Sequence, residues 1–241
     1  MLKYDHLRTR RNAMLSYAII VLILLATSNW IAFIATSNVQ HRKYVKILRE
    51  HKVMKEHRYK VFLAEESLKR RYNDTITSIE IKFYAPIFVE MGEKFGVNWQ
   101  IFPAIKYRES GWRGCGIFSD SGALGPMQIL DGTGRQQAER LGIRFRKGIT
   151  LRNDVLNTTL GCAYVSEAVR LMIRKKSKEP YYEAAQYYTS GPRYKTNLTK
   201  GPLTKKKILD FSKGVFDDYS LLIYLYDEVK NDFPVDSFKI K

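Results

Sequence analysis

The sequence predicts a mainly α-helical fold, with one helical domain preceded by an apolar segment and a charged helical segment. Apolar residues recur in several runs at the three-to-four-residue spacing of an amphipathic helix. No run shows the two-residue alternation of a half-buried strand. Hydrophobic residues make up 45% and aromatic residues 13% of the 241-residue chain, which is enough for a packed core.

The first element is an apolar run from Met14 to Ala35 that contains no Asp, Glu, Lys or Arg. As a helix it would measure about 33 Å, against about 30 Å for the hydrocarbon core of a bilayer. We expect an uncleaved signal anchor that crosses a membrane. A cleaved signal peptide stays open, because Ala26–Ser28 and Ala35–Ser37 are similar to cleavage sites. A buried core helix is the third alternative.

Basic residues flank the apolar run on both sides. Residues 1–13 form a basic N-terminal segment, and a second basic group begins at Arg42. The positive-inside rule therefore gives little contrast between the two sides. The orientation of the chain has to be argued from its chemistry.

Residues 38–75 are predicted to form a charged helical stalk. This segment lacks Pro and Gly and is rich in good helix formers, with 11 basic and 5 acidic residues. Its apolar positions do not keep a heptad repeat, so we expect a solvated helix and not a coiled coil. His41, His51 and His57 show no arrangement with Cys or carboxylate residues that suggests a metal site, and they are expected at the surface.

A globular domain is expected over residues 76–200. Pro86 is expected to open a helix that runs to about Phe95, where Gly96 is a suitable stop. Further helices are expected over Trp99–Arg108, Asn153–Ile173 and Tyr181–Tyr188. Residues 201–241 are predicted to form a basic extension, with a loop at Lys205–Lys207 and a helix that includes Tyr219–Val229.

The charge balance favours an acidic partner without identifying it. Lys and Arg outnumber Asp and Glu by 41 to 24, giving a net charge of +17. Nucleic acid, anionic lipid and the acidic polymers of a cell wall are all suitable partners, and an equally good interpretation is a solvated basic surface.

Several kinds of catalytic site are excluded. All four histidines precede residue 76, so the domain has no His-dependent zinc site, Ser-His-Asp triad or Cys-His dyad. Gly132-Thr133-Gly134 lacks the following Gly and Lys of a phosphate-binding loop. We therefore expect no metal and no cofactor. Carboxylate chemistry, supported by aromatic and amide groups, remains.

Glu109 is the candidate catalytic residue. It falls near the end of an expected helix, beside Tyr107 and Trp112. Cleavage of a glycosidic bond at neutral pH needs a carboxylic acid whose pKa is raised by an apolar pocket. A single Glu at a helix end is usually a surface residue, so the assignment depends on the motifs around it.

Three motifs follow one another in the predicted domain. They are Glu109-Ser110, the segment Gly122-Ala123-Leu124-Gly125-Pro126-Met127-Gln128-Ile129, and Tyr187-Tyr188-Thr189-Ser190-Gly191-Pro192. Together they resemble the soluble lytic transglycosylase (SLT) family, over about residues 76–200. The resemblance implies a lysozyme-like fold.

The resemblance also implies an activity. The family cleaves the β-1,4 bond between N-acetylmuramic acid and N-acetylglucosamine in peptidoglycan and forms a 1,6-anhydro product without water. Glu109 would be the sole acid and then the base. Ser110 and Gln128 would bind substrate, and Tyr188 would hydrogen-bond the Glu109 carboxylate. The sequence departs from the family at Pro126, which removes a backbone N–H, and at Thr189, which replaces an Asn.

Several roles stay open. Trp112 is equally suited to the core and to a sugar platform. Asp120 or Asp131 could position a water, as in a hydrolytic muramidase similar to goose-type lysozyme, although loop capping is the preferred interpretation. Cys115 and Cys162 could form a disulfide in an oxidising compartment. A non-catalytic wall-binding component is the third functional hypothesis.

The expected setting follows from these elements together. An anchor, a stalk and a wall-cleaving domain suggest a catalytic domain on the cell-wall side of a membrane, in the periplasm or envelope, or in a virion. Other subunits of a phage virion or of a conjugation or secretion apparatus are expected partners. The basic C-terminal segment could contact nucleic acid, but no aromatic-interleaved recognition motif supports this.

Overall fold

The computed structural model of the chain describes residues 42–43, 45–47, 49–114 and 116–235. The chain divides into two compact units, residues 1–57 and residues 58–241. The predicted anchor at residues 14–35 lies outside the described residues. Within the described part, every helix is too short or too polar for a membrane span.

The described residues of the first unit, from residue 42 to residue 57, are helical and mostly exposed. Lys46 and Lys52 form ion pairs of 3.9 Å with Glu50 and Glu56, each one helical turn away. Such exposed pairs add only a few tenths of a kcal/mol, about 0.3–0.5 each. The helix in this unit is therefore a solvated one.

The second unit begins with a helical segment, residues 58–72, that is exposed on one face only. Ala64, Leu68 and Tyr72 recur every four residues and are buried in the main hydrophobic core. The prediction of a solvated stalk up to residue 75 is wrong for this segment, because an apolar face covers the domain.

Helix α2, Ser78–Phe95, starts at a capping box. The Thr77 backbone N–H donates to the Glu80 carboxylate over 2.8 Å, and the Glu80 N–H donates to the Thr77 hydroxyl over 3.2 Å. The predicted start at Pro86 is wrong, since this proline lies inside the helix. The predicted end is confirmed: Gly96 caps the helix with a left-handed φ of 64°.

Helix α3, Ile101–Ser110, carries the candidate acid near its C-terminal end, as predicted. Residues 101–106 are all buried. Gly111 ends the helix with a φ of 56° and donates its N–H to the carbonyl of Tyr107.

Four short elements and one long helix follow α3. They are α4, Asp131–Leu141, the 3₁₀ turn η1, Thr150–Arg152, helix α5, Asp154–Arg174, helix α6, Pro180–Ser190, and helix α7, Tyr194–Asn197. The predictions of α5 and α6 are confirmed to within two residues. Helix α4 was missed because it is polar and contains Gly132 and Gly134 near its start.

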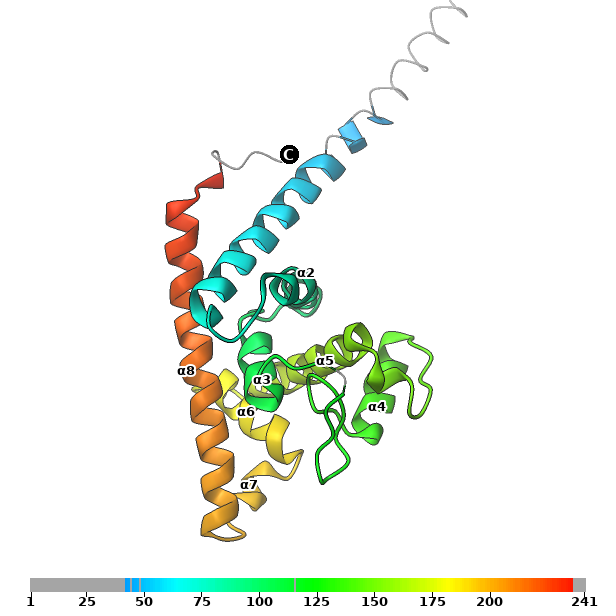
Figure 1. Cartoon of the computed structure of the whole chain (residues 1–241), viewed down its shortest axis with the longest axis vertical. Helices are drawn as coiled ribbons and strands as arrows, with labels where there is room; N and C mark the ends of the chain where they lie inside the picture. Colours follow the sequence, from blue (N-terminus) through cyan, green and yellow to red (C-terminus); the bar gives the residue numbers. More distant parts are fainter. Residues whose placement is uncertain (1–41, 44, 48, 115, 236–241) are drawn as a thin grey trace, which may run out of the picture. The chain divides into compact units, whose positions relative to one another are not determined.

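Helix α8, Pro202–Asp232, is 31 residues long. Lys205–Lys207, predicted as a loop, lie in its first turns, because Pro202 starts the helix at a position where proline is favoured. Val215, Tyr219 and Leu222 are part of the main core. Helix α8 packs against α3 and α6, as Figure 1 shows. It is therefore part of the domain and not an extension from it.

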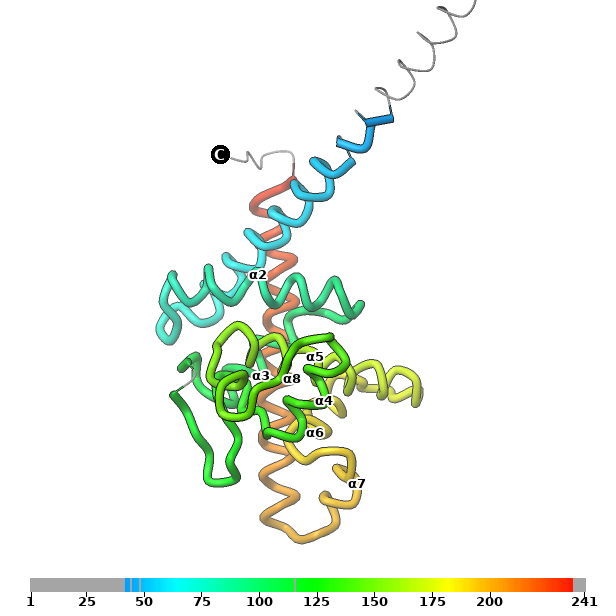
Figure 2. The backbone as a smooth tube through the Cα atoms, turned by 90° about the vertical axis from the view of Figure 1, so that its right-hand side faces the viewer, coloured from blue at the N-terminus to red at the C-terminus, as the bar shows by residue number. Residues whose placement is uncertain are grey.

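Helix α5 is at the centre of the second unit and packs against α2, α3, α4 and α6. In Figure 2 it crosses in front of the long α8. The described residues contain no β-strand, only isolated bridges that join Leu124 to Phe118 and to Ile129. The predicted mainly α fold is confirmed.

Candidate active site

Glu109 lies on the last turn of α3 and lines a cavity of about 560 Å³. The other walls come from the loop that precedes α4, from the first turn of α4, from α5, and from the end of α6 with the residues that follow it. The lining residues are Ser119, Ser121, Ala123, Gln128, Ile129, Leu130, Thr133, Tyr164, Tyr188, Thr189, Ser190, Gly191 and Pro192. Among the described residues that line the cavity, Glu109 is the only acidic one.

The Glu109 carboxyl is held in its neutral form near pH 7. Burial raises its pKa from the usual 4.5 to about 8. Within the described part of the chain it has no ion pair and no hydrogen bond that would stabilise its charge. An unpaired, desolvated carboxyl in a cavity is what a general acid requires.

The loop across the cavity is fixed on α5 by Asn157. The Asn157 amide donates to the carbonyls of Leu124 and Leu151, over 2.8 and 3.1 Å, and accepts from the Met127 N–H over 2.9 Å. Gly125 has a φ of 71°, and a Cβ there would lie 2.6 Å from the Asn157 amide nitrogen. The glycine is therefore required both by its backbone conformation and by close packing.

Pro126 is compatible with this loop. It takes the second position of a turn that the Gln128 N–H closes on the Gly125 carbonyl over 3.0 Å, a position that proline favours. Gln128 has a φ of 45° and donates its side-chain amide to the Gly125 carbonyl over 2.9 Å. Its side chain thereby lines the cavity, where it was expected to meet substrate.

Tyr188 lines the cavity, but its hydroxyl has a different hydrogen-bond partner from the predicted one. Its hydroxyl donates to the Met127 carbonyl over 2.5 Å. A phenol has one proton to donate, so the predicted hydrogen bond from Tyr188 to the Glu109 carboxylate is not formed. Burial raises the pKa of Tyr188, and the charge of Glu109 raises it further, so the two groups are neighbours. Tyr188 fixes the loop that faces the acid.

Ser110 and Trp112 do not line the cavity. Ser110 is buried, and its hydroxyl donates to the Lys106 carbonyl over 3.1 Å. Trp112 is 1% exposed and packs against Tyr72 and Tyr84. The structure brings neither side chain to the cavity: the Ser110 hydroxyl turns back along α3, and the left-handed φ of 69° at Trp112 accompanies a ring that faces the core.

The alternative carboxylates also lie elsewhere. Asp120 and Asp131 are not among the described residues that line the cavity. Asp131 is the first residue of α4 and pairs with Arg135 over 3.7 Å, and the start of this helix has no side-chain capping hydrogen bond. Cys115 lies outside the described residues, and Cys162 is a buried free thiol.

Tyr164 is the main cavity residue that the sequence analysis missed. Its ring lies 5.4 Å from that of Tyr188, centroid to centroid. It occurs in a helix that was predicted, but the direction of its side chain depends on how α5 packs. Ser119, Ser121 and Thr133 flank the recognised loop motif, so a wider window around that motif would have included them.

Helix α8 binds Arg108, the residue that precedes the candidate acid. Asp218 is 1% exposed and accepts hydrogen bonds from Arg108 Nε over 3.0 Å and from Arg71 Nε over 3.1 Å. Arg108 also donates to the Gly214 carbonyl over 3.2 Å. A buried carboxylate between two guanidinium groups thus joins α3 to α8 and to the segment 58–72.

The model of the transglycosylase SLT domain matches residues 86–208, just over half of the chain. The chain belongs to the transglycosylase SLT domain family. The matched region includes Glu109, the loop held by Asn157 and Tyr188, so the SLT domain contains the whole cavity. A search of the curated proteins found no match.

Two solved structures are similar to this chain. One is an inactive mutant of the lytic transglycosylase Slt from Pseudomonas aeruginosa, at 18% identity and a TM-score of 0.45, covering 67% of this chain and 26% of that one. The other is the 70 kDa soluble lytic transglycosylase from Escherichia coli, at 19% identity and a TM-score of 0.46, covering 74% and 30%. The chain thus spans less than a third of either protein.

Proposed function

We propose that the protein is a peptidoglycan lytic transglycosylase in which Glu109 is the single catalytic carboxyl. The observation that supports this is the carboxyl itself: it is unpaired, its pKa is raised to about 8, and it is the only acidic group among the described cavity residues. Membership of the SLT family supports the substrate, the β-1,4 bond between N-acetylmuramic acid and N-acetylglucosamine.

One carboxyl is sufficient if the substrate supplies the nucleophile. Protonated Glu109 donates its proton to the leaving glycosidic oxygen as the bond from C1 of the muramoyl residue breaks. The 6-hydroxyl of the same residue then bonds to C1, and Glu109 takes the hydroxyl proton. The acid is restored, no water is consumed, and the product has a 1,6-anhydro ring.

The test is digestion of purified peptidoglycan by the full chain and by Glu109→Gln, with mass spectrometry of the products. Wild type should release anhydro-muropeptides, and Glu109→Gln should release none while keeping its fold by circular dichroism. Cleavage by Glu109→Gln near the wild-type rate would eliminate the single-acid mechanism. Products heavier by one water would instead indicate a muramidase, and no products from wild type would favour a wall-binding component.

We further propose that the protein acts at a membrane, on its cell-wall side, and opens the wall locally for an envelope-crossing machine such as a virion or a conjugation or secretion apparatus. The apolar run of residues 14–35 and the solvated helix of the first unit support this placement. Fractionation should recover the full chain with membranes and a chain lacking residues 14–35 in the soluble fraction. Equal recovery of both in the soluble fraction would contradict the anchor.

A further inference from the structure

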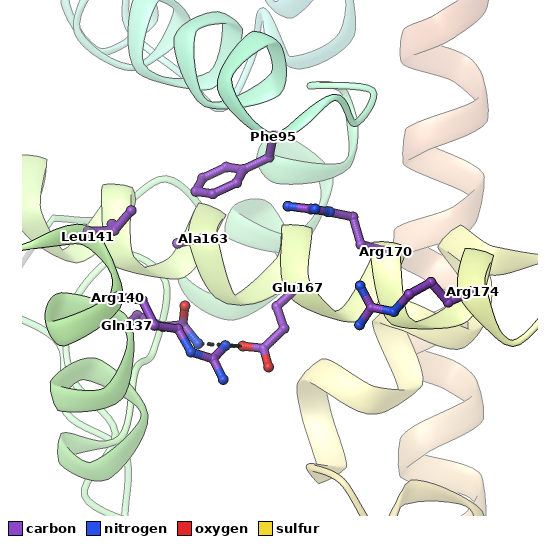
Figure 3. A pocket seen from close by; sticks show the side chains of 8 residues that line it. All are labelled: Phe95, Gln137, Arg140, Leu141, Ala163, Glu167, Arg170 and Arg174. Carbon is purple, nitrogen blue, oxygen red and sulfur yellow. Dashed lines mark hydrogen bonds and ion pairs between the residues drawn. The ribbon is translucent and has the colours of Figure 1, made fainter.

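A second cavity, of about 310 Å³, lies between the end of α2, α4 and α5 (Figure 3). Its walls combine one aromatic ring with several charged and amide groups. The lining residues are Phe95, Gln137, Arg140, Leu141, Ala163, Glu167, Arg170 and Arg174. We refer to it as the arginine pocket. None of these residues lines the cavity that contains Glu109.

The arginine pocket has more positive than negative charge. Arg140 forms an ion pair with Glu167, to which Gln137 also donates a hydrogen bond of 2.7 Å. Arg170 and Arg174 have neither an ion pair nor a hydrogen bond among the residues that the structure describes. Figure 3 shows both side chains extending from α5 toward the space between Phe95 and Glu167. Two guanidinium groups are therefore available to an anion.

The arginine pocket adjoins the active-site cavity along two helices. On α4, Thr133 lines the active-site cavity and Gln137, four residues later, lines the pocket. On α5, Tyr164 lines the active-site cavity and Glu167, three residues later, lines the pocket. Residues at these spacings lie on one helix face, so the two cavities are about one helical turn apart, roughly 5.4 Å.

Tyr187 lies near residues that line each of the two cavities. Its ring lies 5.8 Å from that of Tyr164, centroid to centroid. Burial raises the pKa of Tyr187, Glu167 raises it further and Arg140 lowers it, which places the hydroxyl near that ion pair. A ligand group that leaves the active-site cavity past Tyr164 would thus meet the arginine pocket next.

We infer that the arginine pocket binds the carboxylates of the peptide that each muramoyl residue carries. The inference rests on the proposed function, because the peptide is a further part of the substrate proposed above. Guanidinium groups bind carboxylates through paired, charge-assisted hydrogen bonds. Phe95 offers an apolar surface to the peptide, and Glu167 holds Arg140 in place beside the two unpaired guanidinium groups.

The dimensions are suitable for a peptide branch. An extended peptide spans roughly 3.3–3.6 Å per residue, so two residues cover the helical turn between the cavities. The pocket is small and bounded on three sides by helices, which suits the end of a short branch better than the backbone of a long polyanion. The pocket would select muramoyl residues that still carry their peptides.

The experiment compares three glycan substrates: strands with peptides, the same strands with the peptide carboxylates amidated, and strands with the peptides removed. The full chain, Arg170→Gln/Arg174→Gln and the control Lys206→Gln/Lys207→Gln are assayed for kcat/KM on each. The control removes the same charge from exposed positions on α8, which does not line the pocket.

The pocket variant should lose on the order of tenfold in kcat/KM on strands with free peptide carboxylates. It should match wild type on amidated and on peptide-free strands, and the control should match wild type on all three. An equal loss on all three substrates, or no loss on any, would overturn the inference while leaving the proposed function intact. If the wild type cleaves none of the three, the proposed function itself fails.

Discussion

At the scale of single residues, the function depends on the protonation of Glu109. Its cavity has no cation beside the carboxyl in the described part of the chain, so burial alone shifts the equilibrium toward the neutral acid. Activity and stability should therefore both fall as the pH rises, activity because the acid loses its proton and stability because the folded chain keeps a proton that the unfolded chain loses.

The pH dependence of activity should follow the pKa of Glu109. The free enzyme is competent only while Glu109 is protonated, so kcat/KM should fall as the pH rises through about 8. Well above that pH the decline should approach tenfold per unit. Initial rates of cleavage across roughly pH 3–10, which covers both the expected midpoint and the usual pKa of a Glu side chain, provide the measurement. A profile that falls with a midpoint near 4.5 would mean that the cavity does not hold the carboxyl neutral.

Stability should fall over a lower pH range than activity does. Between about pH 4.5 and 8 the unfolded chain loses a proton that the folded chain keeps, so stability falls as the pH rises through that window. Glu109→Gln removes this effect. The variant should be more stable than wild type above pH 8, by roughly a few kcal/mol, and similar to it below about pH 4.5. Denaturant titrations at pH 4 and pH 9 measure both values; equal differences at the two pH values would contradict the prediction.

The sequence could predict which residues belong to the site more readily than the direction in which each side chain points. Glu109, Gln128, Tyr188 and Thr189 meet in one cavity because motif spacing locates them on helix ends and a loop. Trp112 was ambiguous, because a left-handed turn decides whether its ring faces the cavity or the core. A turn of this kind is not visible in an apolar pattern.

At the scale of elements, the active-site loop is held by close contact between its backbone and α5. A Cβ on Gly161 of α5 would lie 2.5 Å from the Met127 Cβ, so the loop and the helix touch at a residue without a side chain. Any side chain there should push Met127 away and move its neighbour Gln128 in the cavity.

Gly161→Ala should therefore destabilise the protein by about 1–3 kcal/mol and lower activity as well. The matched control is Gly132→Ala in the first turn of α4, where a Cβ would meet nothing within 4 Å. That change should be neutral or stabilising, by up to about 1 kcal/mol. Free energies of unfolding and cleavage rates test both variants. Equal effects of the two substitutions would mean that the close contact at Gly161 is not important.

Element boundaries could be predicted where local capping signals were recognised. Gly96 was recognised as the stop of α2, and the expected start of α5 at Asn153 coincides with the N-cap residue of that helix. The capping box at Thr77 was overlooked in favour of Pro86, and α4 was missed because polar residues and glycines hide its short buried face. The capping box is a local signal that the sequence contains, whereas the buried face of α4 depends on contacts with other elements, which a local pattern does not show.

At the scale of the whole molecule, the second unit is larger than the motifs suggest. The segment 58–72 supplies Ala64, Leu68 and Tyr72 to the core, and α8 supplies Val215 and Tyr219. Both lie outside the predicted domain limits of 76 and 200. They were interpreted as a stalk and an extension because the three recognised motifs all lie between them, within residues 109–192.

Truncation should distinguish a domain component from an extension. A chain ending at residue 200 loses α8 and exposes the core, and it should be insoluble or unfolded. A chain ending at residue 235 keeps α8 and should fold with wild-type stability. Circular dichroism and thermal melting of both chains provide the measurement. A cooperative thermal transition in the shorter chain would show that α8 is dispensable.

Digestion of peptidoglycan in ¹⁸O-labelled water tests the central claim most directly. If Glu109 acts alone and the muramoyl 6-hydroxyl is the nucleophile, the products should contain anhydro ends without ¹⁸O, and Glu109→Gln should yield no products. One ¹⁸O atom at each new reducing end would show that water is the nucleophile. That result would contradict the transglycosylase mechanism and assign the chain a hydrolytic one.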